Sequence, residues 1–367
     1  MAGTVLTSRT LNRALLARQM LLARERISAE TAIERLAGIQ AQQVRPPFVA
    51  LWSRLEGFGR EHLLSLIRGR VAVRSVLMRA TIHLVTARDF VALRGAIQPA
   101  LTAAMQRAVG RHLDGVEMAE VVAVAREAFA SGPRTFAELR RLLAARFPGS
   151  NERALGYAVR TQLALVLVPG QEEWGYRADA DFALAGDWLG ARASTTSETK
   201  LLLKRYLAAF GPASIADARA WSGLPGLQDA FAELRPDLQV FRDDAGRELF
   251  DIPESPRPPE DTPAPVRFLA EFDNAILGHA SRTRIIADRH RPRVITRNLL
   301  VPGTVLVDGL VAATWKLRVG RKDAVLEVKP FGRLTAAEKS EIAEEGDRLA
   351  AFLAPVVERR RLEFSKT

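Results

Sequence analysis

The sequence predicts an α+β fold, mainly α, with three tandem winged helix-turn-helix motifs followed by a C-terminal antiparallel β-barrel-like module. A helix, a short turn, two further helices and a β-prone hairpin recur in this order three times within residues 1–252. Residues 253–265 then contain six prolines and three acids, which cannot continue a helix or enter the middle of a sheet. From residue 266 the pattern is mainly that of strands. The proline-rich stretch therefore predicts a linker or an extended surface strap between the two regions.

The first unit, residues 1–115, is expected to start with an amphipathic helix, and Ser28 is placed to cap the next one. Its strand alternates so that Thr81 and His83 share a face. The elements predicted for this unit are helices over 11–23, 29–39, 47–55 and 61–68 and a strand over 79–85.

The second unit, residues 116–195, repeats the order, with Thr135 as the cap of a helix. The third unit, residues 196–252, ends in a hairpin around the turn at 243–246. Predicted elements of the second unit are helices over 136–146 and 151–163 and strands over 165–169 and 174–177. Those of the third are helices over 197–210, 215–221 and 226–234 and strands over 238–241 and 248–252.

The linker, residues 253–265, leads to the β-barrel-like module of residues 266–367, which a closing helix over 336–353 completes. Turns at Asp308-Gly309 and around Gly320 separate its strands. The strands are predicted over 266–269, 293–296, 303–307, 311–318 and 324–330.

Composition excludes several classes of protein. The 367 residues contain no cysteine, which rules out disulfides, thiolate catalysis and cysteine-ligated metal centres. The five histidines lack metal-ligand spacing, so we predict neither a metal nor a cofactor. No apolar run approaches the roughly 20 residues that span a bilayer, and the N-terminal residues lack a signal-peptide pattern. We expect a cytoplasmic, nucleoid-associated bacterial protein.

The charge favours a polyanionic partner. The chain has 53 basic and 42 acidic residues, a net charge of +11, and 46 of the basic residues are arginines. A GC-rich genome explains the preference for arginine over lysine, but not the excess of bases over acids. The arginine fork suits phosphate oxygens and guanine edges. The expected partner is double-stranded DNA, for which three units in one chain make a monomer sufficient.

Four strings, combined with the three-unit plan, carry a family resemblance over nearly the whole chain: ERLAGIQAQ, LMRATIHLV, EFDNAILGHASRTR and TVLVDGLVAATWKL. The chain resembles the winged-helix DNA glycosylases of the AlkZ and YcaQ type. The resemblance implies a C-shaped molecule around a positively charged channel for duplex DNA. It also implies excision of N7-alkylated purines. In the AlkZ branch it implies unhooking of interstrand crosslinks made by bis-alkylating natural products, and hence self-resistance to such a compound.

A Q-x-Q motif marks the AlkZ branch, and Gln40-Ala41-Gln42 matches it. The resemblance implies that Gln40 and Gln42 hold the water that attacks the anomeric carbon of the deoxyribose. Gln43 lies outside the motif, and its role is open. From the residues alone, a helix C-terminus whose amides bind backbone carbonyls or water explains the same glutamines.

The paired action of two amides sets a geometric condition. On a regular helix, positions i and i+2 point about 200° apart, so Gln40 and Gln42 cannot converge on one water there. We expect Pro46 to end the helix, because a proline biases the residue before it toward extended geometry. A straight helix through Gln42 would argue against paired action.

The chemistry available to neutral amides restricts the substrate. An amide is not a strong base at pH 7, so it can only hold a water for a substrate that is already activated. A cationic N7-alkylated purine leaves as a neutral base without prior protonation, and an amide oxygen stabilises the oxocarbenium-like transition state. The first 199 residues contain no lysine for a Schiff base. A monofunctional enzyme that leaves an abasic site is therefore expected.

Further DNA contacts are expected beside the motif, on the predicted strand, before the C-terminal strands and on a hairpin tip: Arg45, Arg79, Thr81, His83, Arg282, Arg284, Arg318, Arg321 and Lys322. Each has a structural alternative. His83 equally fits a buried core histidine, and Asp273 equally fits a structural partner of one of the nearby arginines. The loop over 318–322 equally fits a solvated turn.

Two other functions stay open. A winged-helix transcription regulator without catalytic activity would share the charge and the helix pattern, and only the glutamine pair and the C-terminal module argue against it. A nuclease needs clustered carboxylates for metal ions. Asp243-Asp244 lies in a predicted hairpin turn and is a poor candidate for such a cluster.

Overall fold

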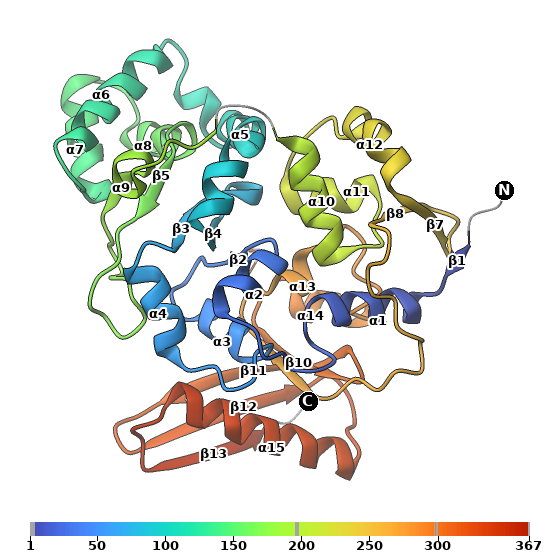
Figure 1. Cartoon of the computed structure of the whole chain (residues 1–367). Helices are drawn as coiled ribbons and strands as arrows, with labels where there is room; N and C mark the ends of the chain where they lie inside the picture. The colour runs from blue at the N-terminus through green and yellow to red at the C-terminus, as the bar shows by residue number, and fades with distance from the viewer. Residues whose placement is uncertain (1–3, 195–197, 297, 299, 366–367) are drawn as a thin grey trace.

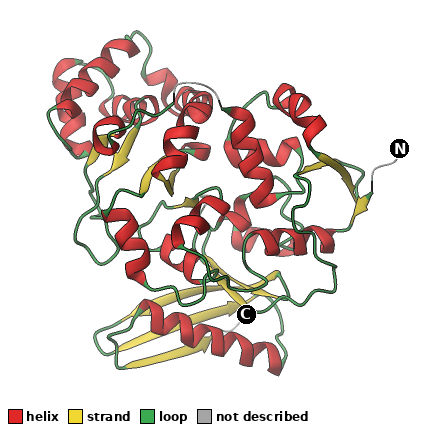
Figure 2. Ribbon diagram, viewed as in Figure 1, coloured by secondary structure: helices red, strands yellow, loops and turns green. Residues whose placement is uncertain are grey.

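The computed structural model describes residues 4–194, 198–296, 298 and 300–365. Figure 1 shows the second unit and the third unit on either side of the long helix α5, with the C-terminal sheet and its helix at the opposite end of the molecule. Figure 2 shows helices throughout and the largest group of strands in that C-terminal part. The start of the helix predicted at 197 lies outside the described residues.

The first unit has the predicted order of a helix, a turn, two helices and a hairpin, with a short strand in the turn. Its elements are α2 (Ala29–Arg35), β2 (Ile39–Gln40), α3 (Pro46–Trp52), α4 (Arg60–Arg68), β3 (Ala72–Val76) and β4 (Ile82–Thr86). The sheet order is β2-β4-β3, and both pairings are antiparallel. Ser28 caps α2, as predicted, through its side chain and the backbone N–H of Thr31.

The second unit repeats this order with α6 (Met118–Ala130), α7 (Phe136–Arg146), α8 (Glu152–Gln162), β5 (Leu165–Leu167) and β6 (Phe182–Leu184). A bridge from Arg134 to Phe182 takes the place of β2. Thr135 and Glu138 form a capping box at the start of α7, which confirms the predicted cap. The strand predicted over 174–177 is wrong, because the chain turns there around Gly175 (φ 78°) and the hairpin closes later.

The third unit contains α10 (Thr199–Phe210), α11 (Ile215–Ser222), α12 (Gln228–Leu234), β7 (Gln239–Asp243) and β8 (Glu248–Asp251). A bridge from Ala213 to Phe250 again precedes the second helix. In all three units the short strand or bridge thus pairs with the second strand of the hairpin.

The N-terminal residues belong to the third unit rather than to the first. Strand β1 (Val5–Leu6) pairs parallel with β7, and α1 (Ser8–Arg18) packs against α10. The proline-rich strap over 253–265 lies along the same helix. Arg13 donates to the carbonyl oxygen of Thr262 at 2.6 Å, and Arg18 donates to that of Pro256 at 3.3 Å. The predicted first unit, residues 1–115, is therefore not one continuous unit of structure.

Two helices in the connections between units were not predicted. Helix α5 (Ala87–Val109) follows β4 and contacts α8 and α10, so it joins the second unit to the third. Thr86 caps it, and Pro99 lies inside it. The short α9 (Ala185–Leu189) follows β6, and 3-10 turns lie at 78–80, 110–112, 235–237 and 288–290.

The C-terminal module is an open sheet and not a closed barrel. Its strands β9 (Arg267–Leu269), β10 (Gly303–Val307), β11 (Leu310–Val319), β12 (Asp323–Pro330) and β13 (Arg359–Phe364) lie in the order β13-β12-β11-β10-β9. Helix α15 (Ala336–Leu353) was predicted with these bounds, but it is the crossover that brings β13 parallel to β12. The strand predicted over 293–296 is wrong, because α14 (Arg291–Val294) occupies that place. Helix α13 (Asn274–Leu277) precedes it.

Candidate active site around the glutamine motif

The chain reaches the glutamine motif by a tight turn after α2. The helix ends at Arg35, earlier than predicted, and Ala37 (φ 52°) and Gly38 (φ 89°) then adopt left-handed conformations. The backbone N–H of Gly38 donates to the carbonyl oxygen of Ile33 at 3.0 Å, which closes the helix end. We had expected Pro46 to end this helix, but it does not. It begins α3, where a proline fits the first helical position.

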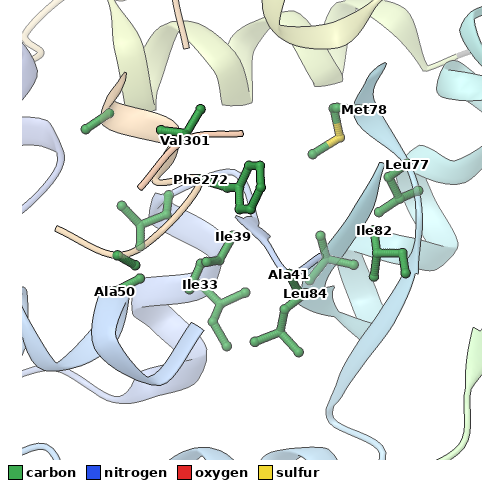
Figure 3. Close-up of a cluster of buried hydrophobic side chains, with 14 of the residues drawn as sticks. Ile33, Ile39, Ala41, Ala50, Leu77, Met78, Ile82, Leu84, Phe272 and Val301 are labelled. Carbon is green, nitrogen blue, oxygen red and sulfur yellow. The ribbon is translucent and has the colours of Figure 1, made fainter. Parts of the chain in front are cut away.

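The motif itself lies on extended backbone at the edge of a sheet. Gln40 pairs with His83 across β2 and β4, and the N–H of Ala41 donates to the carbonyl oxygen of Ile82 at 2.7 Å. Ile39 and Ala41 point into the buried apolar cluster that Figure 3 shows. Paired action of the two amides requires non-helical backbone at Gln40 and Gln42. This condition is met, because no helix runs through either residue.

Gln40 is held inside a hydrogen-bond network. Only 5% of its surface is exposed, and its Oε1 accepts a hydrogen bond from Nη2 of Arg79 at 2.6 Å. The other terminal nitrogen of Arg79 donates to the carbonyl oxygen of Trp221 at 2.7 Å. Asn274 accepts from Arg79 at 3.2 Å and donates to the carbonyl oxygen of Gly38 at 3.2 Å. Arg79 and Asn274 thereby tie the first unit to α11 and to the C-terminal module.

Gln42, in contrast, is exposed and borders a pocket of about 560 Å³. Its Oε1 accepts a hydrogen bond from the backbone N–H of Ile82 at 3.3 Å. Its Nε2 makes no hydrogen bond to any residue that the structure describes, and Gln43 lines the same pocket. The two motif glutamines therefore have different environments, and Gln42 is the one that an incoming substrate can reach.

Arg79 lies on the strained turn between β3 and β4. Arg79 (φ 56°) and the following Ala80 (φ 56°) are both left-handed, a conformation that costs of order 1–3 kcal/mol for residues other than glycine. Burial, with a smaller effect from the positive charge of Arg282, lowers the pKa of Arg79 to about 10, so it stays charged at neutral pH. The network around Gln40 holds this turn, and the guanidinium group faces inward rather than toward a DNA backbone.

His83 and Thr81 each have a hydrogen-bond partner within the first unit. His83 is fully buried, and its Nδ1 lies 3.1 Å from the carbonyl oxygen of Thr81. Burial and the nearby charge of Arg79 lower the pKa of His83 to about 3, so the ring is neutral at physiological pH. The hydroxyl of Thr81 donates to the carbonyl oxygen of Met78 at 3.1 Å. The core-histidine alternative is the one that this geometry favours.

The two arginines after His279 do not project together. Arg284 is buried, donates to the carbonyl oxygen of Pro212 at 3.0 Å, and has its pKa lowered by burial. Arg282 is half-buried and donates to the carbonyl oxygen of Ile276 at 3.1 Å. Asp273 pairs with neither of them. Buried Arg54 binds it through two hydrogen bonds of 2.8 and 2.9 Å.

The other candidate DNA contacts lie at the surface. Arg45 is half-buried at the start of α3 and makes no ion pair within the part of the chain that the structure describes. The tip between β11 and β12 is a tight hairpin, as predicted, and Arg321 and Lys322 are exposed on it. Arg318 is 3.3 Å from a carboxylate oxygen of Glu327 across the hairpin.

Sequence reasoning missed the basic side chains that line the pocket beside Gln42. Arg74 comes from β3, Arg140 from α7, Arg160 from α8 and Arg177 from the loop before β6. These positions are far apart in a chain with 46 arginines, so no local signal separated them from the rest. No sequence pattern indicated a role for Asn274, because its contact with Gly38 depends on tertiary structure.

Within residues 4–194, 198–296, 298 and 300–365, no three histidine, aspartate or glutamate side chains gather closely enough to hold a metal ion. Over the same residues, no helix combines the length and the apolar character that crossing a membrane requires.

Comparison with known proteins identifies the family to which the chain belongs. The family model described as DNA glycosylase AlkZ-like matches residues 33–352, so the chain belongs to the AlkZ-like DNA glycosylase family. An interstrand DNA cross-link repair glycosylase from Streptomyces sahachiroi is 29% identical over 154 residues, which is 40% of this chain and 40% of that protein. The solved structure of Streptomyces sahachiroi DNA glycosylase AlkZ is similar with a TM-score of 0.78 and 21% identity, covering 99% of this chain and 100% of that one.

Proposed function

We propose that the chain is a monofunctional DNA glycosylase that hydrolyses the N-glycosidic bond of cationic N7-alkylated purines in double-stranded DNA. The observation that carries the proposal is the exposed amide of Gln42 beside an open, arginine-lined pocket. Family membership supports the reaction class. The cross-link repair activity named for the Streptomyces sahachiroi relative supports the extension to interstrand crosslinks. The proposal also includes bulky adducts and protection of the host from a genotoxic natural product.

The groups around Gln42 suit a substrate that is already activated. An N7-alkylated guanine leaves as a neutral base, so its departure needs no general acid. Among the described residues that line the pocket there is one carboxyl group, that of Asp179, and it lies 3.7 Å from Arg177. Buried His83 is neutral, so the pocket offers no general acid. Ile82 holds the Gln42 carbonyl oxygen at 3.3 Å, and a second lone pair of that oxygen accepts a hydrogen bond from the attacking water.

The two motif glutamines divide the work in this proposal. Gln42 contacts the water and the sugar. Gln40 acts through Arg79 and Asn274 as a positioning residue, because its carbonyl oxygen is bound at 2.6 Å and its side chain is almost fully buried. The network fixes the extended backbone over 39–41 and so the direction in which Gln42 leaves it.

DNA contacts outside the pocket complete the proposed interface. The exposed cations of the hairpin tip, Arg321 and Lys322, enter a groove, and Arg45 binds a phosphate beside the lesion. Arg318 follows the hairpin into the same groove. We propose that one chain binds the duplex as a monomer in the bacterial nucleoid, since the three units and the C-terminal module belong to one chain.

A base-release assay tests this function directly. Duplexes carrying one N7-methylguanine, one bulky N7 adduct or one N7–N7 crosslink are incubated with the protein, and free base and alkali-labile abasic sites are measured. We expect release of the neutral alkylated base and an intact abasic strand until alkali is added. Tight duplex binding with no release from any of the three substrates would instead support the transcription regulator.

A further inference from the structure

The pocket beside Gln42 lies between the first unit and the second. Its walls come from the loop after β2, from the β3–β4 hairpin, from the first turn of α7, from α8 and from the chain before β6. Apolar side chains form part of the lining, and the charged side chains are Arg74, Arg140, Arg160, Arg177 and Asp179. A site of this size, about 560 Å³, accommodates a group larger than a water molecule.

The charges in this pocket do not balance. Four guanidinium groups line the pocket with one carboxylate, Asp179, which lies 3.7 Å from Arg177. A second carboxylate, Asp181, lies 3.5 Å from the same arginine, so the other three arginines have no carboxylate partner in the lining. The Nε atoms of Arg74 and Arg160 are buried and have no hydrogen-bond partner among the residues that the structure describes. Only 4% of the surface of Arg74 is exposed, and its one hydrogen bond goes to the carbonyl oxygen of Ala41 at 2.7 Å. An anion in the pocket would offset the excess positive charge of these side chains.

The other groups that line the pocket also favour an anion. The N-terminus of α7 borders the pocket through Thr135 and Phe136 and adds the partial positive charge of a helix N-terminus, which the capping carboxylate of Glu138 offsets in part. Burial lowers the pKa of both Arg74 and Arg160, although each guanidinium group lies over a tyrosine ring, that of Tyr176 at 4.6 Å and that of Tyr157 at 5.5 Å. A cationic alkylated base is disfavoured in these surroundings, and a phosphate is favoured.

We propose that this pocket binds one phosphodiester of the DNA strand next to the nucleotide that Gln42 faces. Placing the phosphodiester next to that nucleotide rests on the proposed glycosylase function. The preference of the pocket for an anion does not depend on that function. Arg140 and Arg177 contact the phosphate oxygens from two sides, and Arg74 and Arg160 lie at the base of the pocket. The bound phosphate also neutralises charge that would otherwise oppose the positive sugar of the transition state.

Helix α7 offers a matched pair of variants. Arg140 lines the pocket, and its own side chain only returns to the carbonyl oxygen of Phe136 at 3.3 Å. Arg141 is the next residue, is exposed, and does not line the pocket. Arg140→Ala and Arg141→Ala therefore remove the same charge from the same helix. Arg177→Ala, in an exposed loop, is a second pocket variant if Arg140→Ala does not fold.

The first experiment measures binding to an undamaged duplex by fluorescence anisotropy over a range of KCl concentrations. Each phosphate neutralised by the protein adds about 0.9 to the slope of log K against log salt. We expect Arg140→Ala and Arg177→Ala each to reduce the steepness of that slope by about 1, and Arg141→Ala to leave it unchanged. Equal slopes for wild type, Arg140→Ala and Arg177→Ala would overturn the proposal.

The second experiment locates the phosphate. A duplex carries N7-methylguanine on a 2′-fluorinated sugar, which resists hydrolysis, and a neutral methylphosphonate replaces one linkage at a time around the lesion. We expect wild type to lose about tenfold in affinity at one linkage near the lesion, and Arg140→Ala to lose nothing further there. If the methylphosphonate and the Arg140→Ala substitution lower the affinity independently of each other at every linkage, the proposal is overturned.

Failure of the phosphate site is distinguishable from failure of the glycosylase proposal. If the pocket binds no phosphate, base release by wild type continues and the salt slopes of the three arginine variants agree. If the protein is no glycosylase, base release is absent, but the slope still separates Arg140→Ala from Arg141→Ala.

Discussion

The two motif glutamines have different roles in the proposed reaction. The sequence indicated the pair and the need for non-helical backbone at Gln40 and Gln42, because that condition follows from helix geometry. It gave no sign that Gln40 would be buried against Arg79, because that contact depends on the β3–β4 turn. Removing one member of the network tests whether it positions Gln42.

Asn274→Ala removes the link between Gly38 and Arg79. We expect about a tenfold fall in the single-turnover rate of base release, with DNA affinity unchanged, because the motif backbone loses its fixed geometry. Asn151→Ala, which removes the cap of α8, is the control: it costs about 1 kcal/mol of stability without touching the motif. Equal rates for the two variants would contradict a positioning role.

His83 makes the stability of the protein depend on pH. Its folded pKa of about 3, lowered mainly by burial, lies below the unfolded value near 6.5. Between these two pKa values the unfolded chain binds a proton that the folded protein does not. The contribution of neutral His83 to the free energy of unfolding is therefore complete above pH 6.5 and is lost as the pH falls toward 3. At pH 5 the loss is about 2 kcal/mol. Urea unfolding at pH 7.5 and 5 should show a loss that is smaller in His83→Gln than in wild type by about this amount. Buried His279, whose pKa is also lowered to about 3, contributes its own loss in both proteins. An equal pH effect in both proteins would contradict it.

At the scale of elements, capping and turn residues made several helices predictable. Ser28 and Thr135 cap the helices that the sequence assigned to them, and the hairpin turn at 243–246 forms as expected. Helix α5 was missed because Pro99 interrupts its pattern. The expected end of α2 at Pro46 was wrong because the left-handed residues Ala37 and Gly38 end the helix first.

Gly38 lies in the turn between α2 and β2, so its conformation sets the position of the motif strand. At φ 89° an added Cβ would lie 2.7 Å from Cγ1 of Val85. We expect Gly38→Ala to lower the free energy of unfolding by about 2–3 kcal/mol and to displace β2, because it adds a steric contact to the left-handed strain. Gly57→Ala is the control: its φ is 67°, but no atom lies within 4 Å of an added Cβ. We expect it to cost about 1 kcal/mol. Equal costs in denaturant titrations would contradict the contact argument.

At the scale of the whole molecule, contacts between distant segments assemble the site. The sequence predicted the repeated order of elements, because it appears in local patterns. It could not show that β1 joins the third unit, that α15 returns β13 parallel to β12, or that four arginines share one pocket. These features depend on pairing over long stretches of chain. The C-shaped channel stays a prediction.

The buried pair of Arg54 and Asp273 tests how the first unit is joined to the C-terminal module. Both side chains are at most 2% exposed. We expect Arg54→Ala to lower the free energy of unfolding by about 3–5 kcal/mol, because it leaves the Asp273 carboxylate buried without a partner. Arg26→Ala breaks an exposed pair with Glu56 and should cost far less, because water screens that pair. Similar losses in urea titrations of the two variants would contradict this assignment.

The single-turnover rate of base release from a duplex with one N7-methylguanine separates the two exposed glutamines when it is measured for wild type, Gln42→Ala and Gln43→Ala. Both glutamines line the same pocket and are exposed, so the two substitutions differ mainly in position. We predict a fall of at least about 100-fold for Gln42→Ala and less than about threefold for Gln43→Ala, with binding intact. Equal rates for wild type and Gln42→Ala would contradict the account.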